Sequence, residues 1–131
     1  MDAKKILSIV LLICCTIVPI VASVAYERHR LHGITAEILA RAPEKGNFSP
    51  RRLKLEVAEG DEVKLRIRNV DCVMHGFAIP GLKVDAGEIK AGHSTTVQFT
   101  PEEAGEYEFY CTVWCSEHHL QMRGVLEIAR P

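Results

Sequence analysis

The sequence predicts an all-β domain, built as an antiparallel β-sandwich, behind one N-terminal helix that spans a membrane. Two observations support this prediction. The first is an uncharged run over residues 6–25, which as a helix would cross the roughly 30 Å hydrocarbon core of a bilayer. The second is a series of short segments with alternating apolar and polar residues. Turns rich in glycine and proline separate these segments, which is typical of half-buried strands.

The overall composition sets limits on size and partners. The chain has 131 residues, with 16 lysines and arginines against 17 aspartates and glutamates. This length suits one domain with additional segments. The balanced charge leaves no basic excess to neutralise phosphates, so nucleic acid is not expected as a partner. We divide the chain into a stub and anchor at residues 1–25, a juxtamembrane linker with a possible first edge strand at 26–47, and the sandwich at 48–131.

Residues 6–25 are interpreted as a retained membrane anchor, because lysines precede the run and Tyr26 follows it at the expected interface. The alternative is a cleaved signal peptide, since residues 23–25 fit a small-x-small cleavage site. We favour the anchor because the run is longer than the roughly 7–15 apolar residues of a signal peptide. Cys14 and Cys15 are interpreted as apolar filling of the helix. The domain that follows should be exported or tethered to the membrane.

The segment after the anchor is polar and then rich in turns. Residues 26–33 are interpreted as a juxtamembrane linker, in which His29 and His32 should be solvated. Residues 35–42 permit either a first edge strand or a short helix. Residues 43–50, with the sequence PEKGNFSP, should break the chain.

Alternation predicts the strands of the sandwich. Two half-buried strands lie at residues 53–57 and 63–67, with a turn at Glu59-Gly60-Asp61 between them. Residues 82–89 are expected to be irregular or a weak strand. Further strand segments, in chain order, are expected within 70–79 and at 97–100, 107–110 and 124–128.

The segment from Cys111 to Met122 concentrates metal-binding side chains in the pattern C-x3-C-x3-H-x2-M. Its donors are Cys111, Cys115, His119 and Met122. Thiolate and thioether sulfurs are soft donors, and imidazole suits copper well. His75, far upstream, would complete a copper site.

Other uses of this pattern leave residues without a role. A disulfide would not use His119 or Met122. Structural zinc prefers Cys and His, and a Cys–His nucleophile needs only one thiol and one base. A mononuclear blue-copper site takes two His, one Cys and a weak axial Met, so it is satisfied without Cys111. Cys111 is therefore the discriminating residue, because a second thiolate on the loop would let two sulfurs bridge two copper ions.

The His75-Gly76-Phe77 segment and the C-x3-C-x3-H-x2-M loop resemble the dinuclear copper A (CuA) domain of cytochrome c oxidase subunit II. A similar domain occurs in nitrous oxide reductase. The resemblance covers roughly residues 48–128. It implies a cupredoxin-like Greek-key β-sandwich on one transmembrane helix, with one-electron transfer as its function and no complete active site of its own.

The resemblance also implies a ligand set. Cys111 and Cys115 would bridge both coppers. His75 and Met122 would complete one copper. His119 and the backbone carbonyl of Val113 would complete the other. His118 is one residue short of the family spacing, so it should face solvent or support a ligand from behind.

The same resemblance implies partners and a location. Electrons would arrive from cytochrome c or a small copper protein and pass to haem in subunit I of a haem-copper oxidase. The copper domain would lie on the periplasmic or outer side of the cell membrane. One alternative is a membrane-anchored CuA carrier for a nitrous or nitric oxide reductase, and another is a mononuclear blue-copper protein. A copper-delivery protein is a further alternative, although the chain has only 3 methionines and no Met-rich tract.

Two positions depart from the family. Val113 stands where subunit II usually has an acidic residue that helps hold magnesium, which puts that magnesium site in doubt. The family often has Asp three residues before the upstream His. Here Cys72 takes that place, and Asp71 is one residue earlier. We expect Cys72 to be a buried packing residue, with a thiol near His75 as the alternative.

Three further residues are candidates for minor roles. His93 follows a glycine in a turn and is expected to be a solvated surface residue. Trp114 lies between the two cysteines, where it would either cover the metal or form part of an electron-entry patch. Arg123 would either pair with a partner or be solvated.

Overall fold

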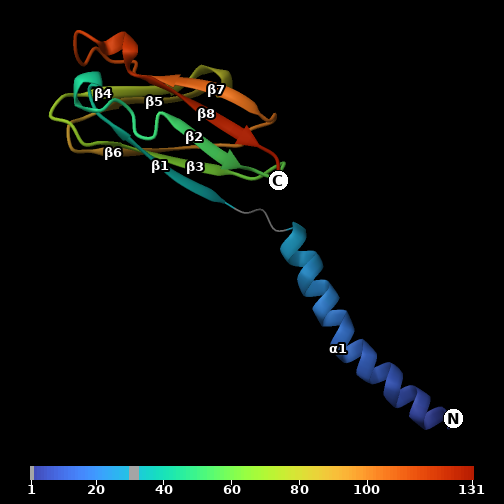
Figure 1. Cartoon of the computed structure of the whole chain (residues 1–131). Helices are drawn as coiled ribbons and strands as arrows, with labels where there is room; N and C mark the ends of the chain where they lie inside the picture. The colour runs from blue at the N-terminus through green and yellow to red at the C-terminus, as the bar shows by residue number, and fades with distance from the viewer. Residues whose placement is uncertain (1, 30–32) are drawn as a thin grey trace. The chain divides into compact units, whose positions relative to one another are not determined.

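The computed structural model describes residues 2–29 and 33–131. The chain divides into two compact units, residues 1–31 and 32–131 (Figure 1). His32 lies outside the described residues, and so does the side chain of His29, so the expectation for these two histidines stays a prediction.

The first unit is a single helix, α1 (Ala3–His29). Its apolar part is long enough to cross a membrane, by length and composition. Cys14 and Cys15 are exposed on its surface. The helix continues four residues past the uncharged run, so the first part of the predicted juxtamembrane linker, residues 26–29, is helical. No glycine or proline stands there to end the helix.

The second unit is a β-sandwich of two sheets (Figure 1). The three-stranded sheet has the order β1-β3-β6, and the five-stranded sheet has the order β2-β8-β7-β4-β5. The strands are β1 (Ile34–Ala40), β2 (Arg52–Glu56), β3 (Val63–Asn69), β4 (His75–Ile79), β5 (Val84–Ile89), β6 (Ser94–Phe99), β7 (Gly105–Tyr110) and β8 (Arg123–Ala129). Three 3₁₀ helices connect them: η1 (Pro43–Lys45), η2 (Pro80–Leu82) and η3 (His119–Gln121).

The prediction of wholly antiparallel pairing is wrong, because the sheets are mixed. Strand β1 pairs with β3 in parallel, and β2 pairs with β8 in parallel. Strands β2 and β3, which the sequence places on either side of a turn, lie in different sheets. Alternation shows which face of a strand is buried, but it does not show the direction of the neighbouring strand.

The structure decides two segments that the sequence left open. Residues 34–40 form a strand at the edge of the three-stranded sheet. Residues 84–89 form an edge strand, β5, which pairs antiparallel with β4. The register shifts between Phe77 and Ala78, opposite Gly87, whose φ of 63° suits glycine. This irregularity hides the alternation that would otherwise predict β5.

Three phenylalanines form the centre of the core. Phe48, Phe77 and Phe109 are buried, and their ring centroids lie 5.3–5.7 Å apart. Aromatic pairs of this kind contribute about 0.5–1.5 kcal/mol each beyond area burial. Phe77 is two residues after His75 on β4, and Phe109 is two residues before Cys111 at the end of β7. Because side chains two apart share one face of a strand, the aromatic core continues directly into the candidate site.

Candidate metal centre

Neighbouring strands of the five-stranded sheet bring the first candidate ligands together. Strand β4 starts at His75, and Cys111 follows the end of β7. The Cys111 sulfur lies 3.9 Å from His75 Nδ1. The metal-binding atoms of His75, Cys111 and Cys115 all lie within 4.8 Å of one another. Residues 36 positions apart in the chain therefore face one common point.

The loop between β7 and β8 adds the other candidates. The Cys115 sulfur lies 3.6 Å from His119 Nδ1 and 3.6 Å from the Met122 sulfur. The Cys111 sulfur lies 3.1 Å from the carbonyl oxygen of Val113. The structure thus brings all six predicted residues into one cluster. Their roles as ligands stay a proposal.

The cluster is closed on its inner side and partly open on its outer side. His75, Cys111 and Met122 are buried. Val113, Cys115 and His119 are half-buried. Soft sulfur donors that are shielded from water favour copper over the harder, oxygen-binding cations.

Gly76 allows strand β4 to pass close to the loop between β7 and β8. Its backbone N–H donates to the Cys111 sulfur at 3.3 Å. A Cβ at this position would collide with the Thr112 side chain and press against Val113. The sequence shows this glycine beside His75, but only the structure shows why a side chain is excluded.

Asp71 contacts the ring nitrogen of His75 that does not face Cys111. Its Oδ2 lies 3.2 Å from His75 Nε2, and it also accepts a hydrogen bond from the Ala42 N–H. Its Oδ1 accepts from Lys45 Nζ and from the Cys72 N–H. A carboxylate in this place favours the tautomer with the proton on Nε2, which leaves Nδ1 free for a metal.

The expectation that Cys72 is a buried packing residue is wrong, and its sulfur lies 3.6 Å from the Asp71 carboxylate that contacts His75. Its side chain is exposed, and its sulfur accepts from Lys45 Nζ at 3.3 Å rather than contacting His75. The loop between β3 and β4 instead turns Asp71 inward, so the carboxylate supports His75 from four residues upstream rather than three. The side chain of Asp71 is only 2% exposed.

The same environment shifts the pKa values of three side chains. Burial alone would raise the pKa of Asp71, but the hydrogen bonds from Lys45 and two backbone N–H groups hold it well below its usual range. Burial lowers the pKa of His75, against the opposing effect of Asp71. Burial and the neighbouring Cys111 raise the pKa of Cys115 to about 12. Without a metal, Cys115 is therefore a neutral thiol at neutral pH.

The flanking residues mostly lie as predicted. His118 is exposed, and its Nδ1 lies 2.6 Å from Glu44 Oε1. His93 is exposed and bonds to the Ala91 carbonyl. Arg123 Nε donates to the Leu120 carbonyl.

Trp114 covers His119 but leaves most of its own surface in water. Its ring centroid lies 5.7 Å from that of His119, and the residue is 70% exposed. Leu120 is 74% exposed on the same loop. A hollow of about 430 Å³ beside the cluster is lined by residues that include Tyr110, Leu120 and Arg123. The outer side of the cluster is therefore accessible, and Trp114 and Leu120 are exposed on it.

Asn47 is a site residue that sequence reasoning missed. It is buried, has a positive φ of 65°, and donates from Nδ2 to the Gln121 carbonyl at 2.8 Å. Gln121 lies between His119 and Met122. The only signal in the sequence is a Gly-Asn pair in a turn-rich segment, which predicts a turn but no partner.

A family model for the cupredoxin-like domain matches residues 14–126. Among curated proteins, the nitrous-oxide reductase of Cupriavidus necator is 37% identical over 93 residues, which cover 69% of this chain and 14% of that protein. Cytochrome c oxidase subunit 2 of Thermus thermophilus is 32% identical over 74 residues, which cover 56% of this chain and 53% of that protein. The matches thus span about a seventh and about half of these two relatives.

Solved structures show the same fold. Auracyanin A, a blue copper protein of Chloroflexus aurantiacus, has a TM-score of 0.59 at 21% identity, covering 75% of this chain and 100% of that chain. A chain of a haem-copper terminal oxidase dimer has a TM-score of 0.59 at 18% identity, covering 96% of this chain and 98% of that chain. These likenesses confirm the predicted cupredoxin-like sandwich.

Proposed function

This chain belongs to the cupredoxin-like domain family, and we propose that it transfers single electrons through a dinuclear copper centre as subunit II of a haem-copper terminal oxidase. The observation that carries this proposal is the second thiol. Cys111 and Cys115 both reach the common point that faces His75. A mononuclear blue-copper site would use only one of these sulfurs.

The donor set fits two copper ions. His75 and Met122 would complete one ion, and His119 with the Val113 carbonyl would complete the other. Each sulfur lies near one donor of each set: Cys111 is close to His75 and Val113, and Cys115 is close to Met122 and His119. Sulfurs that bridge two ions need neighbours from both sets.

The chain's own residues would keep this centre rigid and dry. When bound, two bridged copper ions share one electron, so their bonds change little on reduction. The strands β4 and β7 fix His75 and Cys111, and the Asp71 hydrogen bond fixes the imidazole. The phenylalanine core below the cluster excludes water. A rigid frame that is closed to water on its inner side would keep the reorganisation energy of electron transfer small.

The outer side of the cluster would receive the donor. Trp114 and Leu120 are exposed beside the half-buried His119, and apolar contacts of this kind suit a short-lived redox complex. The donor would be cytochrome c or a small copper protein, and the acceptor would be haem in subunit I. Helix α1 would anchor the chain in the cell membrane, with the copper domain on the periplasmic or outer side.

A second candidate function follows from the nitrous-oxide reductase relative, whose 37% identity exceeds the 32% of the oxidase subunit. In this role the chain would be a membrane-anchored CuA carrier for a nitrous or nitric oxide reductase. Purification from native membranes separates the two roles. A haem-copper subunit that co-purifies with the chain supports the oxidase, and a reductase in its place supports the carrier.

Copper loading of the detergent-solubilised full chain tests the proposed centre. We expect two coppers per chain and a seven-line mixed-valence EPR signal. One copper per chain with a four-line signal would contradict the dinuclear centre and favour blue copper. Copper that exchanges readily without any mixed-valence signal would favour a delivery protein.

A further inference from the structure

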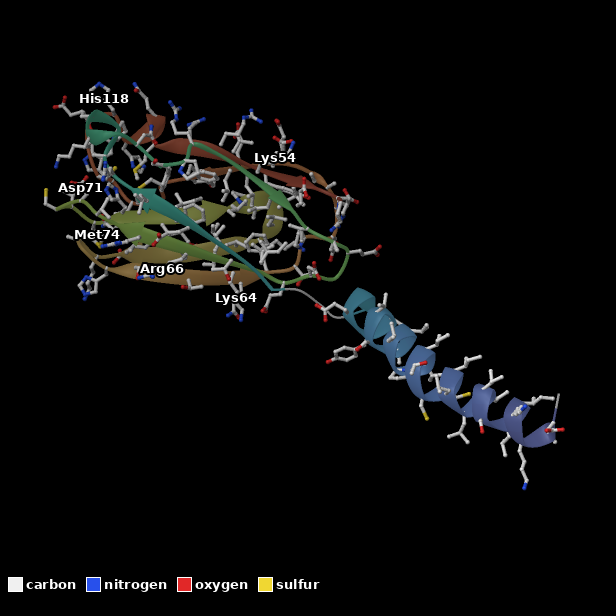
Figure 2. All side chains as sticks on the ribbon, turned by 60° about the horizontal axis from the view of Figure 1, so that its bottom comes forward. Lys54, Lys64, Arg66, Asp71, Met74 and His118 are labelled. Carbon is white, nitrogen blue, oxygen red and sulfur yellow. The ribbon has the colours of Figure 1, made fainter. Side chains whose placement is uncertain are left out.

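The segment of residues 43–48, which we call the clasp, contacts both halves of the candidate site. It lies between β1 of the three-stranded sheet and β2 of the five-stranded sheet. It therefore forms part of the crossover between the layers. Figure 2 shows Asp71 and His118, two side chains that the clasp contacts, at the same end of the sandwich. Three clasp side chains reach the residues that hold the candidate ligands.

Lys45 acts on the His75 half. Its Nζ lies 2.9 Å from Asp71 Oδ1 and 3.3 Å from the Cys72 sulfur. The other oxygen of Asp71 contacts His75 Nε2 at 3.2 Å and accepts the Ala42 N–H, just before the clasp. The Lys45 side chain is 54% exposed, whereas the side chain of Asp71 that it pairs with is buried. Lys45 thus helps to direct a buried carboxylate toward His75.

Asn47 acts on the loop half. Its amide donates to the Gln121 carbonyl, and its Oδ1 accepts the Phe48 N–H at 2.7 Å. Gln121 lies within the short stretch that carries His119 and Met122. Because Asn47 is buried and uses both ends of its amide in hydrogen bonds, it positions this stretch relative to the core.

Glu44 adds a contact at the surface. Its carboxylate lies 2.6 Å from His118 Nδ1, and both side chains are substantially exposed. His118 precedes the candidate ligand His119. An exposed pair of this kind contributes little to stability, so the proposal below does not depend on it.

We propose that the clasp is a positioning element that sets both halves of the metal site before the metal binds, through Lys45 on His75 and through Asn47 on His119 and Met122. This inference rests on the proposed function for the identity of the metal. The arrangement itself is present without a metal, so the clasp can be tested in the metal-free chain. Neither Lys45 nor Asn47 would touch the metal.

The test compares substitutions in the full chain, in detergent, with the histidine rings labelled for NMR. Lys45→Met removes the ammonium but keeps the length of the side chain. Asn47→Gly removes the amide and tolerates the positive φ. The matched control is Lys54→Met. Lys54 is an exposed lysine on β2 that pairs with Glu127 at 3.2 Å. It lies away from the clasp (Figure 2).

In the metal-free chain we expect K45M to change the ring signals of His75 but not those of His119. N47G should change the ring signals of His119 but not those of His75. K54M should change neither. In the copper-loaded chain, both clasp variants should weaken copper binding by roughly 10- to 100-fold, as is usual when an outer partner of a ligand is lost. Lys45→Arg should restore most of this loss, since it keeps the positive charge beside Asp71.

Two results would overturn the proposal that the clasp positions the candidate ligands. One is a loss of stability in K45M and N47G with unchanged histidine signals, which would mean structural support only. The other is an equal response to K54M. If the unmodified chain binds one copper or none, the proposed function fails, but the metal-free comparison still decides whether the clasp positions the histidines.

Discussion

The Asp71 carboxylate lies 3.2 Å from His75 Nε2, on the side of the imidazole ring that faces away from Cys111. The two contacts use the two ring nitrogens separately: Nε2 faces the carboxylate, and Nδ1 faces the sulfur at 3.9 Å. A candidate ligand held this way would enter a metal site already oriented. The orientation comes from a loop residue that itself receives hydrogen bonds from Lys45 and from two backbone N–H groups.

Asp71→Asn should therefore weaken copper binding by about 10- to 100-fold. An amide can keep the shape but cannot attract the Nε2 proton as strongly, and it leaves Lys45 without its counter-charge. Competition with a copper chelator measures the change. Glu88→Gln, an exposed carboxylate on β5, is the control and should bind copper as the unmodified chain does. Equal copper affinity in the Asp71 and Glu88 variants would show that Asp71 does not position a copper ligand.

Cys111→Ser should abolish the mixed-valence signal and leave at most one copper per chain. Serine is nearly isosteric, but its hydroxyl is a poor bridge for copper. EPR spectra and copper analysis measure the outcome. Cys72→Ser is the matched control, because that thiol is exposed and outside the cluster. A seven-line spectrum that survives in C111S would show that our role for Cys111 is wrong.

Gly76→Ala should destabilise the domain by about 1–3 kcal/mol, the usual range for an overpacked site. The added methyl group would collide with the Thr112 side chain and displace the Cys111 sulfur from the Gly76 N–H. Urea unfolding of the metal-free chain gives the free energy. Gly33→Ala is the control, since no atom of the described residues lies within 4 Å of a Cβ there. The expectation fails if both variants unfold at the same urea concentration.

The metal-free domain should lose stability as the pH falls below about 6.5. His75 has a folded-state pKa below the 6.5 of an unfolded histidine, so the unfolded chain binds more protons in this range and is favoured by acid. Asp71, also with a lowered pKa, adds a second loss below about 4. Urea midpoints at pH 7.5, 5.5 and 4.5 measure the first loss, and a series below pH 4 measures the second.

His75→Gln should flatten the decline between pH 7.5 and 5.5, because glutamine does not titrate. His93→Gln, which changes an exposed histidine in a turn, should leave the decline unchanged. A decline of the same size in the His75 variant would mean that another group is responsible.

Local patterns in the sequence predicted much of the fold and of the site. The alternation of Val63, Leu65 and Ile67 predicted the buried face of β3, and these side chains are fully buried. Five of the six candidate ligands lie within one short loop, and the spacing of the four that offer side-chain donors suggested one centre. His75 was the upstream histidine expected to complete the site, and the resemblance to a known family then added the Val113 carbonyl.

Contacts between distant segments could not be predicted in this way. Asn47 meets Gln121 across 74 positions of the chain, and no periodicity connects them. Asp71 replaces the expected residue at position 72 because the loop before β4 turns it inward, and the direction of a loop side chain depends on tertiary contacts. The parallel pairing of β2 with β8 has the same origin.

The place of β8 in its sheet sets an order for the maturation of the protein. Strand β8 lies between β2 and β7, yet both neighbours are synthesised before it. The loop that carries the candidate ligands ends where β8 begins, at Arg123, so until β8 inserts between those strands the C-terminal end of this loop is not held in the sheet. Pairing across such sequence separation is slow compared with local folding. Metal uptake should therefore follow the insertion of β8, and cells that make this protein would need to supply copper to the folded domain rather than to the nascent chain.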